Sequence, residues 1–282
     1  ALLKARSHLK RGEIVKAEIL YQMVLKAFPS NKKAKQGLAS LKNFPKTSAK
    51  LSVSQEAIEQ LVRFYNTGRL ELVIEKAQKL SKVYPEEFMV WNLLGAASAG
   101  LGKVVEASQA FKRVIEINPK FADGHNNFGL ACQQLGRREE AIKAFTIALK
   151  LNPNYARAYN NLGNTLKEIG NLEEAIKFYK KALSLEPSYA AGYNNLGNAL
   201  KDQGKLGEAI TAFNKALDLQ DDNAATYNNI GLTLKDQGKL EKAKASFNKA
   251  LSLKSDYAKA HRNLSTLVKY KPGNSQIKSV EQ

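Results

Sequence analysis

A stretch of five residues, an aromatic or histidine residue followed by Asn-Asn-Leu-Gly or a close variant, recurs in this chain every 34 residues. It begins at Tyr159, Tyr193 and Tyr227, and related stretches begin at His125 and Trp91. A period of roughly 20 to 50 residues is typical of repeat architectures, in which each unit packs only against its neighbours. The 282 residues are therefore expected to form one long array rather than two globular domains.

A second set of residues recurs at the same interval and predicts two helices in each unit. Glycines can end the first helix in a left-handed conformation, alanines permit close helix approach, aromatic rings fill the gap to the next unit, and prolines end the second helix. They are Gly102, Gly136, Gly170, Gly204 and Gly238; Ala107, Ala141, Ala175, Ala209 and Ala243; Phe111, Phe145, Tyr179, Phe213 and Phe247; and Pro85, Pro119, Pro153 and Pro187. Because one such hairpin cannot bury its own apolar face, the units must stack.

This pattern is similar to that of the tetratricopeptide-repeat (TPR) family. The resemblance implies an all-α fold, a right-handed α-solenoid (superhelix) of stacked helical hairpins with a C-terminal capping helix. Six repeats are predicted, at 54–87, 88–121, 122–155, 156–189, 190–223 and 224–257. An N-terminal block at 1–42 holds a truncated repeat, marked by Gly12, Ala17, Tyr21 and Pro29, and one further helix. A linker is expected at 43–53, the capping helix at 258–271 and a tail at 272–282.

Other sequence features argue against catalysis. The chain contains no phosphate loop, dinucleotide-binding glycine motif, nucleophile elbow or metal-ligand pair, so we expect no enzyme activity, cofactor or metal site. The single cysteine, Cys132, is expected to be a small core residue. No apolar run approaches the ~18 residues of a membrane span. The chain starts at Ala1 without a secretory signal, so we expect a fragment or processed form of a cytoplasmic protein.

The charge is strongly basic, with 44 Lys and Arg against 26 Asp and Glu. Within residues 1–50, twelve basic residues face only Glu13 and Glu18. Such a balance can attract nucleic acid or an acidic partner, but lysines spread along helices also form ordinary solvated faces. We therefore expect protein or peptide partners, acidic ones among them, with nucleic acid as the weaker alternative. Self-association through exposed repeat ends also remains open.

The family geometry implies that the first helix of each repeat lines a concave face, and this sequence places amides there. One row, here named the asparagine ladder, comprises Asn127, Asn161, Asn195, Asn229 and Asn263. One turn further on are Asn164 and Asn198, and beyond them a lysine row of Lys167, Lys201 and Lys235. A carboxamide offers a donor and an acceptor together, and a peptide backbone presents the complementary pair. These residues are the candidate peptide-binding site.

Two structural alternatives apply to the same residues. The ladder asparagines can instead bond neighbouring helices, together with the preceding row of Asn92, Asn126, Asn160, Asn194 and Asn228. The lysines can form a solvated face.

Two narrower resemblances suggest an alternative function. The ladder is similar to the one in the superhelical repeats of O-GlcNAc transferase, and residues 261–272 resemble the junction of bacterial TPR proteins fused to a sulfotransferase domain. The leading interpretation is a protein-interaction scaffold that binds an extended peptide in its concave groove. The alternative is the substrate-recruiting repeat domain of a larger glycosyl- or sulfotransferase. The carboxylate clamp of co-chaperones matches at Asn198, Asn229 and Lys259 but not at Asn194 or Asn263, so chaperone-tail binding is not expected.

Overall fold

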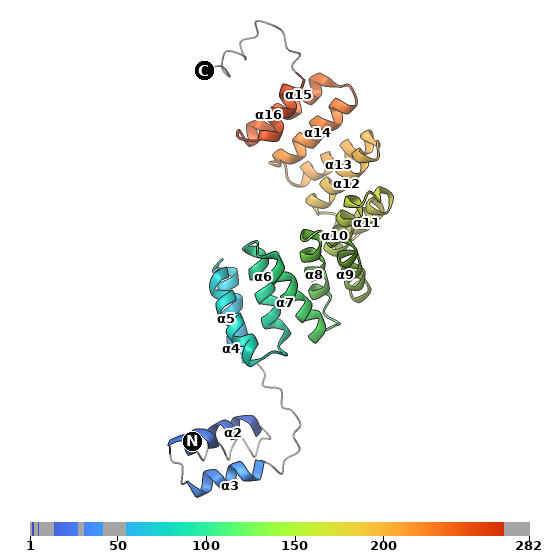
Figure 1. Ribbon diagram of the computed structural model, residues 1–282. Helices are drawn as coiled ribbons and strands as arrows, with labels where there is room; N and C mark the ends of the chain where they lie inside the picture. Colours follow the sequence, from blue (N-terminus) through green and yellow to red (C-terminus); the bar gives the residue numbers. More distant parts are fainter. Residues whose placement is uncertain (1, 3–4, 6–13, 28–30, 42–54, 268–282) are drawn as a thin grey trace. The chain divides into compact units, whose positions relative to one another are not determined.

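The computed structural model describes residues 2, 5, 14–27, 31–41 and 55–267, and every regular element within these ranges is an α-helix (Figure 1). The chain divides into two compact units, residues 1–97 and 98–282, which are described separately. The predicted linker at 43–53, the tail at 272–282, and Gly12 and Pro29 lie outside the described residues. No described helix is both long and apolar enough to cross a bilayer.

The first unit contains two pairs of packed helices. Helices α2 (Ile14–Ala27) and α3 (Lys32–Leu41) contact each other, as do α4 (Gln55–Asn66) and α5 (Leu70–Val83). The α2–α3 pair is built around Tyr21, which is 2% exposed, with Ala17 and Ala34 fully buried beside it. Gly37 lies so close to this ring that a β-carbon would collide with it. Helix α6 (Phe88–Gly100) spans the division between the units.

The second unit repeats a hairpin of a first and a second helix. The second helices are α7 (Val104–Ile117), α9 (Arg138–Leu151), α11 (Leu172–Leu185), α13 (Leu206–Leu219) and α15 (Leu240–Leu253). The first helices are α8 (Ala122–Gln134), α10 (Ala156–Glu168), α12 (Ala190–Asp202), α14 (Ala224–Asp236) and α16 (Ala258–Ser265). Equivalent helices start 34 residues apart, so the sequence period is the structural period, and the predicted α-solenoid is confirmed.

The turn inside each hairpin is set by a glycine. Gly170 and Gly204 have φ of 82° and 81°, in the left-handed region, where a β-carbon would be strained. After Gly170, the Asn171 N–H donates to the Leu166 carbonyl over 2.9 Å, which closes the first helix in the Schellman manner. The predicted left-handed glycines are confirmed.

The close helix approach predicted at the repeated alanines is also present, and Gly163 takes part in it. A β-carbon on Gly163 would lie 2.7 Å from Cε1 of Tyr179, and both Tyr179 and Ala175 are fully buried. Phe145, Phe213 and Phe247 are equally buried one repeat before, one repeat after and two repeats after Tyr179. In these four hairpins an aromatic ring therefore packs directly on a glycine of the same hairpin.

Candidate functional site

The first helices of the second unit form its more tightly packed layer. The backbones of neighbouring first helices approach within 8 Å between Cα atoms from α8 through α16, whereas those of neighbouring second helices, from α7 through α15, do not. A stack whose layers differ in this way bends toward the tighter layer, so the first helices line the inner side of the curve. The asparagine ladder lies on these helices.

Each ladder asparagine after Asn127 is bonded to the preceding repeat. The Nδ2 atom of Asn161 donates to Oδ1 of Asn126 over 3.0 Å, and Asn195 donates to Asn160 over 2.9 Å. Two more bonds follow the same rule, Asn229 to Asn194 at 3.2 Å and Asn263 to Asn228 at 2.8 Å. The partner is always 35 residues earlier, which is one repeat plus one residue.

The two asparagine rows therefore differ in exposure and in role. Asn126, Asn160 and Asn228 of the preceding row are 3–5% exposed and accept the bonds. The ladder residues are half-buried. Because one N–H of each donor is used between repeats, its carboxamide orientation is fixed, and its Oδ1 and second N–H remain for a ligand. Each ladder carboxamide therefore donates toward the preceding repeat and presents its Oδ1 atom and second N–H in one fixed orientation.

Asn127, at the start of the ladder, is half-buried, and its Oδ1 accepts a long bond of 3.4 Å from the Asn126 amide.

The two asparagines one turn further on have different surroundings. The Tyr179 hydroxyl donates to Oδ1 of Asn164 over 2.7 Å, and burial raises the pKa of that hydroxyl above its usual range, so it stays protonated. In the next repeat the equivalent ring is Phe213, which has no hydroxyl, and the half-buried Asn198 side chain bonds no described residue. Of this pair, Asn198 has the amide with more capacity for a ligand.

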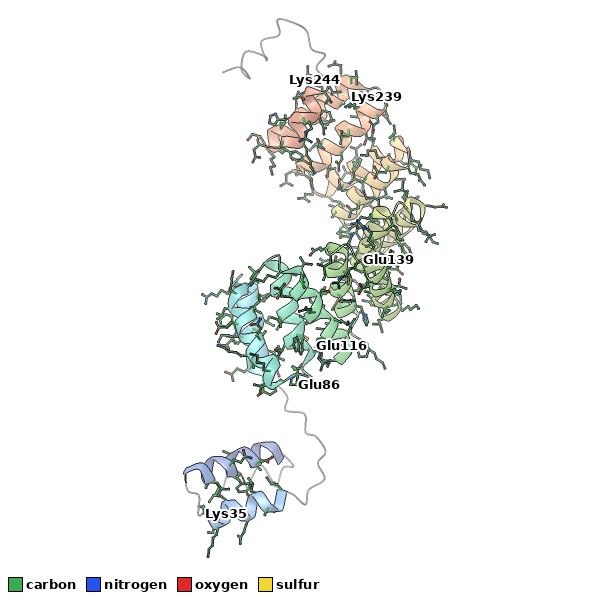
Figure 2. All side chains as sticks on the ribbon, viewed as in Figure 1. Lys35, Glu86, Glu116, Glu139, Lys239 and Lys244 are labelled. Carbon is green, nitrogen blue, oxygen red and sulfur yellow. The ribbon has the colours of Figure 1, made fainter. Side chains whose placement is uncertain are left out.

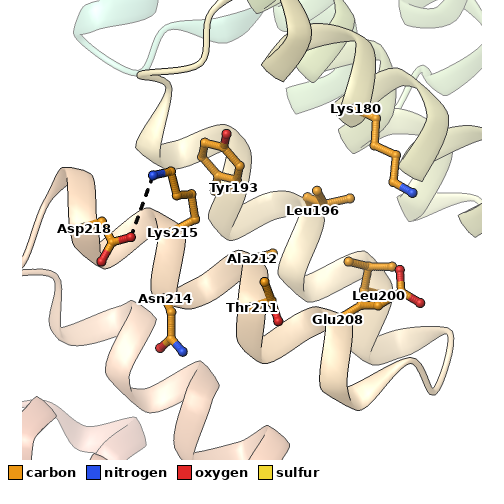
Figure 3. A pocket seen from close by; sticks show the side chains of 10 residues that line it. All are labelled: Lys180, Tyr193, Leu196, Leu200, Glu208, Thr211, Ala212, Asn214, Lys215 and Asp218. Atoms are coloured by element: carbon orange, nitrogen blue, oxygen red, sulfur yellow. Dashed lines mark ion pairs between the residues drawn. The ribbon is translucent and has the colours of Figure 1, made fainter.

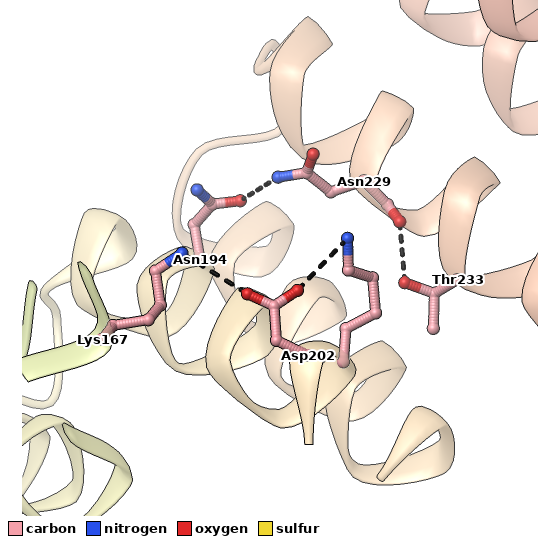
Figure 4. Close-up of polar contacts among 6 residues, drawn as sticks. Lys167, Asn194, Asp202, Asn229 and Thr233 are labelled. Atoms are coloured by element: carbon pink, nitrogen blue, oxygen red, sulfur yellow. Dashed lines mark hydrogen bonds and ion pairs between the residues drawn. The ribbon is translucent and has the colours of Figure 1, made fainter. Parts of the chain in front are cut away.

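Two lysines of the lysine row, Lys167 (Figure 4) and Lys235, also contact a residue of the following repeat. Lys167 Nζ lies 3.5 Å from Asp202, and Lys201 lies 3.6 Å from the same carboxylate. Lys235 Nζ instead donates to the Thr266 hydroxyl over 3.0 Å. Two of the three lysine charges thus share one acid, whereas Lys235 has a neutral partner. Lys235 is the member of the row best able to attract an anion.

The sequence did not single out a basic pocket at the C-terminal end of the ladder. This pocket of about 320 Å³ brings Asn229 and Asn263 together with Lys259, Arg262 and Tyr257. Arg262 stands one period after the buried Asn228. The sequence feature that could have predicted this pocket is therefore a cation in place of an asparagine of the preceding row. Amide groups beside two exposed cations can bind a carboxylate. Among the described residues, no group of His, Cys, Asp and Glu could hold a metal ion.

Comparison with known proteins identifies the repeats. Family models described as TPR or tetratricopeptide repeats match residues 90–121, 129–170, 163–204 and 188–256. The chain belongs to the tetratricopeptide-repeat family. No curated protein matches it.

Several solved structures share the fold. PilW, a widely conserved type IV pilus biogenesis factor, has a TM-score of 0.68 and 20% identity over 77% of this chain and 100% of its own. MamA has a TM-score of 0.53 and 26% identity over 59% of this chain and 97% of its own. YrrB, a TPR protein with an unusual peptide-binding site, has a TM-score of 0.53 and 19% identity over 66% and 96%. These similarities show the fold of stacked tetratricopeptide repeats.

Proposed function

We propose that this chain binds an extended peptide along the first-helix face of residues 122–265. The observation that carries the proposal is the fixed orientation of Asn161, Asn195, Asn229 and Asn263, whose Nδ2 atoms are bonded to the preceding repeat. Oriented carboxamides lose less side-chain entropy when a ligand arrives. They offer regularly spaced acceptors to the N–H groups of an extended backbone, with little regard to its side chains.

The positive charges at the α16 end of this face determine which end of the peptide binds there. The pocket at Lys259 and Arg262 suits an acidic residue or a terminal carboxylate, and Lys235 lies on the neighbouring α14. We therefore expect acidic groups at the end of the peptide that lies on α16. YrrB, named for its peptide-binding site, is consistent with this use of the fold.

The test uses peptides selected on the intact chain from a random 12-residue display library, then synthesised with a fluorescent label. Asn195→Ala with Asn229→Ala removes two ladder amides together with their inter-repeat bonds. Asn160→Ala with Asn194→Ala removes the same two bonds but keeps the ladder amides. At about 0.5–1.5 kcal/mol per hydrogen bond, we expect the first pair to weaken binding about tenfold or more, and the second pair clearly less.

Circular dichroism checks that both double variants are folded. Equal loss of affinity in the two would assign the effect to inter-repeat bonding and reject the ladder as the binding group. Methylating the peptide's backbone nitrogens should also weaken binding, because it removes the donors that the ladder oxygens would accept.

The alternative from sequence, a substrate-recruiting repeat domain of a transferase, uses the same face. Sequencing the gene beyond the codon for Gln282 tests it, and a catalytic domain there would favour it.

A further inference from the structure

A pocket of about 520 Å³ opens between α11 and α13, with α12 as its floor (Figure 3). Tyr193, Leu196 and Leu200 of α12 form an apolar base, and Ala212 of α13 adds to it. The rim is polar and carries Lys180 and Lys215, among other residues. The pocket lies on the second-helix side of the stack, so it is separate from the ladder.

The Tyr193 ring lacks the cover that Tyr159 and Tyr227, its equivalents in the two adjacent repeats, have. One repeat earlier, Phe178 stacks on Tyr159, with 6.0 Å between ring centroids. Phe178 is replaced one period later by Ala212, whose methyl group cannot reach across the ring. An aromatic surface that is packed in one repeat is thereby left open in the next.

The repeat after the pocket covers its tyrosine differently. Lys249 Nζ lies 5.9 Å from the centroid of the Tyr227 ring. The equivalent Lys215 instead pairs with Asp218 at 3.8 Å, as drawn in Figure 3. Ser252 stands one period after Asp218, so Lys249 has no such acid beside it.

A change of charge accompanies this change of packing. At the positions of Glu208, Ile210 and Gln220 on the α13 repeat, the α15 repeat has Lys242, Lys244 and Lys254. Together with Lys239 and Lys249 they form the α15 lysine surface, of which Lys239 and Lys244 are labelled in Figure 2. All five are exposed, and none forms an ion pair with a described residue. Glu241 is the one acid on this helix.

We propose that the second-helix side of α12–α15 docks an acidic protein segment, with an apolar side chain in the Tyr193 pocket and carboxylates on Lys242 and Lys249. Charge complementarity selects an acidic partner. The apolar pocket, together with Leu240 and Leu253, which are 48% and 38% exposed, favours a protein segment over nucleic acid, which has no aliphatic side chains.

The spacing of such a segment follows from the repeat. Helices α13 and α15 each contact α14 but do not contact each other. Contacting helices lie about 8–10 Å apart, so the distance from α13 to α15 is between about 10 and 20 Å. An extended chain advances about 3.3 Å per residue, so the apolar anchor and its nearest acidic residue should be about three to six residues apart.

The test selects 12-residue peptides from a random display library on the full chain and measures enriched peptides by fluorescence anisotropy. Ala212→Phe fills the pocket with the side chain that the preceding repeat already accommodates. Lys242→Glu with Lys249→Glu reverses the charge of exposed residues. Lys143→Glu with Lys150→Glu on α9 makes the same change on another second helix and is the matched control.

We expect enriched peptides with an apolar residue about three to six positions from acids, the spacing that the helix separation gives. Each of the first two variants should weaken their binding at least tenfold, while the control and Asn195→Ala with Asn229→Ala leave it unchanged. Failure to enrich such peptides, or affinity that survives Ala212→Phe, would overturn the proposal.

Two further outcomes also reject this surface. Peptides sensitive only to the ladder variant would belong to the inner face, which supports the function proposed above instead. A single-stranded 20-nucleotide DNA that binds more tightly than the peptides, and is lost only in the lysine variant, would identify a general anion site.

Discussion

The Tyr179 hydroxyl donates a hydrogen bond to Oδ1 of Asn164 over 2.7 Å, linking the second helix α11 to the first helix α10 of the same hairpin. The next hairpin has Phe213 and Asn198 at these positions. At this contact the two successive hairpins thus differ by one hydroxyl group.

Tyr179→Phe should lower the free energy of unfolding by about 0.5–1.5 kcal/mol, the usual net value of one hydrogen bond. Phe213→Tyr is the reciprocal change and should offer Asn198 the same bond, so it should cost less than Tyr179→Phe or stabilise the chain. Urea unfolding followed by circular dichroism measures both. Equal destabilisation by the two would show that the Asn164 bond contributes nothing.

Gly163→Ala should destabilise the chain by about 1–3 kcal/mol through overpacking, because its β-carbon would lie 2.7 Å from the Tyr179 ring. Gly207 is the matched control, since it lies in α13 with no atom within 4 Å of an added β-carbon. Gly207→Ala should stabilise the helix by up to about 1 kcal/mol. Thermal unfolding compares them, and a neutral Gly163→Ala would mean that the ring moves aside freely.

Gly170→Ala should cost about 1–2 kcal/mol because φ is 82° at this turn, where a β-carbon meets the backbone. Packing against the rest of the chain is not the cause, since beyond Gly170 and its two chain neighbours no atom lies within 4 Å of an added β-carbon. Gly170→Asn should cost less, because asparagine tolerates the left-handed region better than alanine. If asparagine and alanine destabilised the chain equally in urea, backbone strain would not be the reason.

Cys132 should react slowly with a disulfide reagent such as DTNB in the native state. Its side chain is fully buried, and burial raises the pKa of the thiol from 9.0 to about 11. Near neutral pH the thiolate fraction is then about a hundredfold lower. Ser252→Cys on the exposed face of α15 adds a fast reference thiol to the same molecule. Labelling of both thiols at one rate without denaturant would contradict this burial.

The sequence by itself determined the repeat and most of its local geometry. The 34-residue period, the two helices per unit, and the left-handed Gly170 and Gly204 were all predicted. These features follow from residue size, backbone freedom and apolar periodicity, which act within one hairpin and recur in every copy.

Only the tertiary structure decided which side chains meet between repeats. Asn195 bonds Asn160, and Lys167 shares Asp202 with Lys201, because successive hairpins are rotated so that facing positions are 35 rather than 34 residues apart. The open Tyr193 ring depends likewise on Ala212 and on the pairing of Lys215 with Asp218. Rotation between hairpins is set by many packing contacts acting together, so no local pattern in the sequence specifies it.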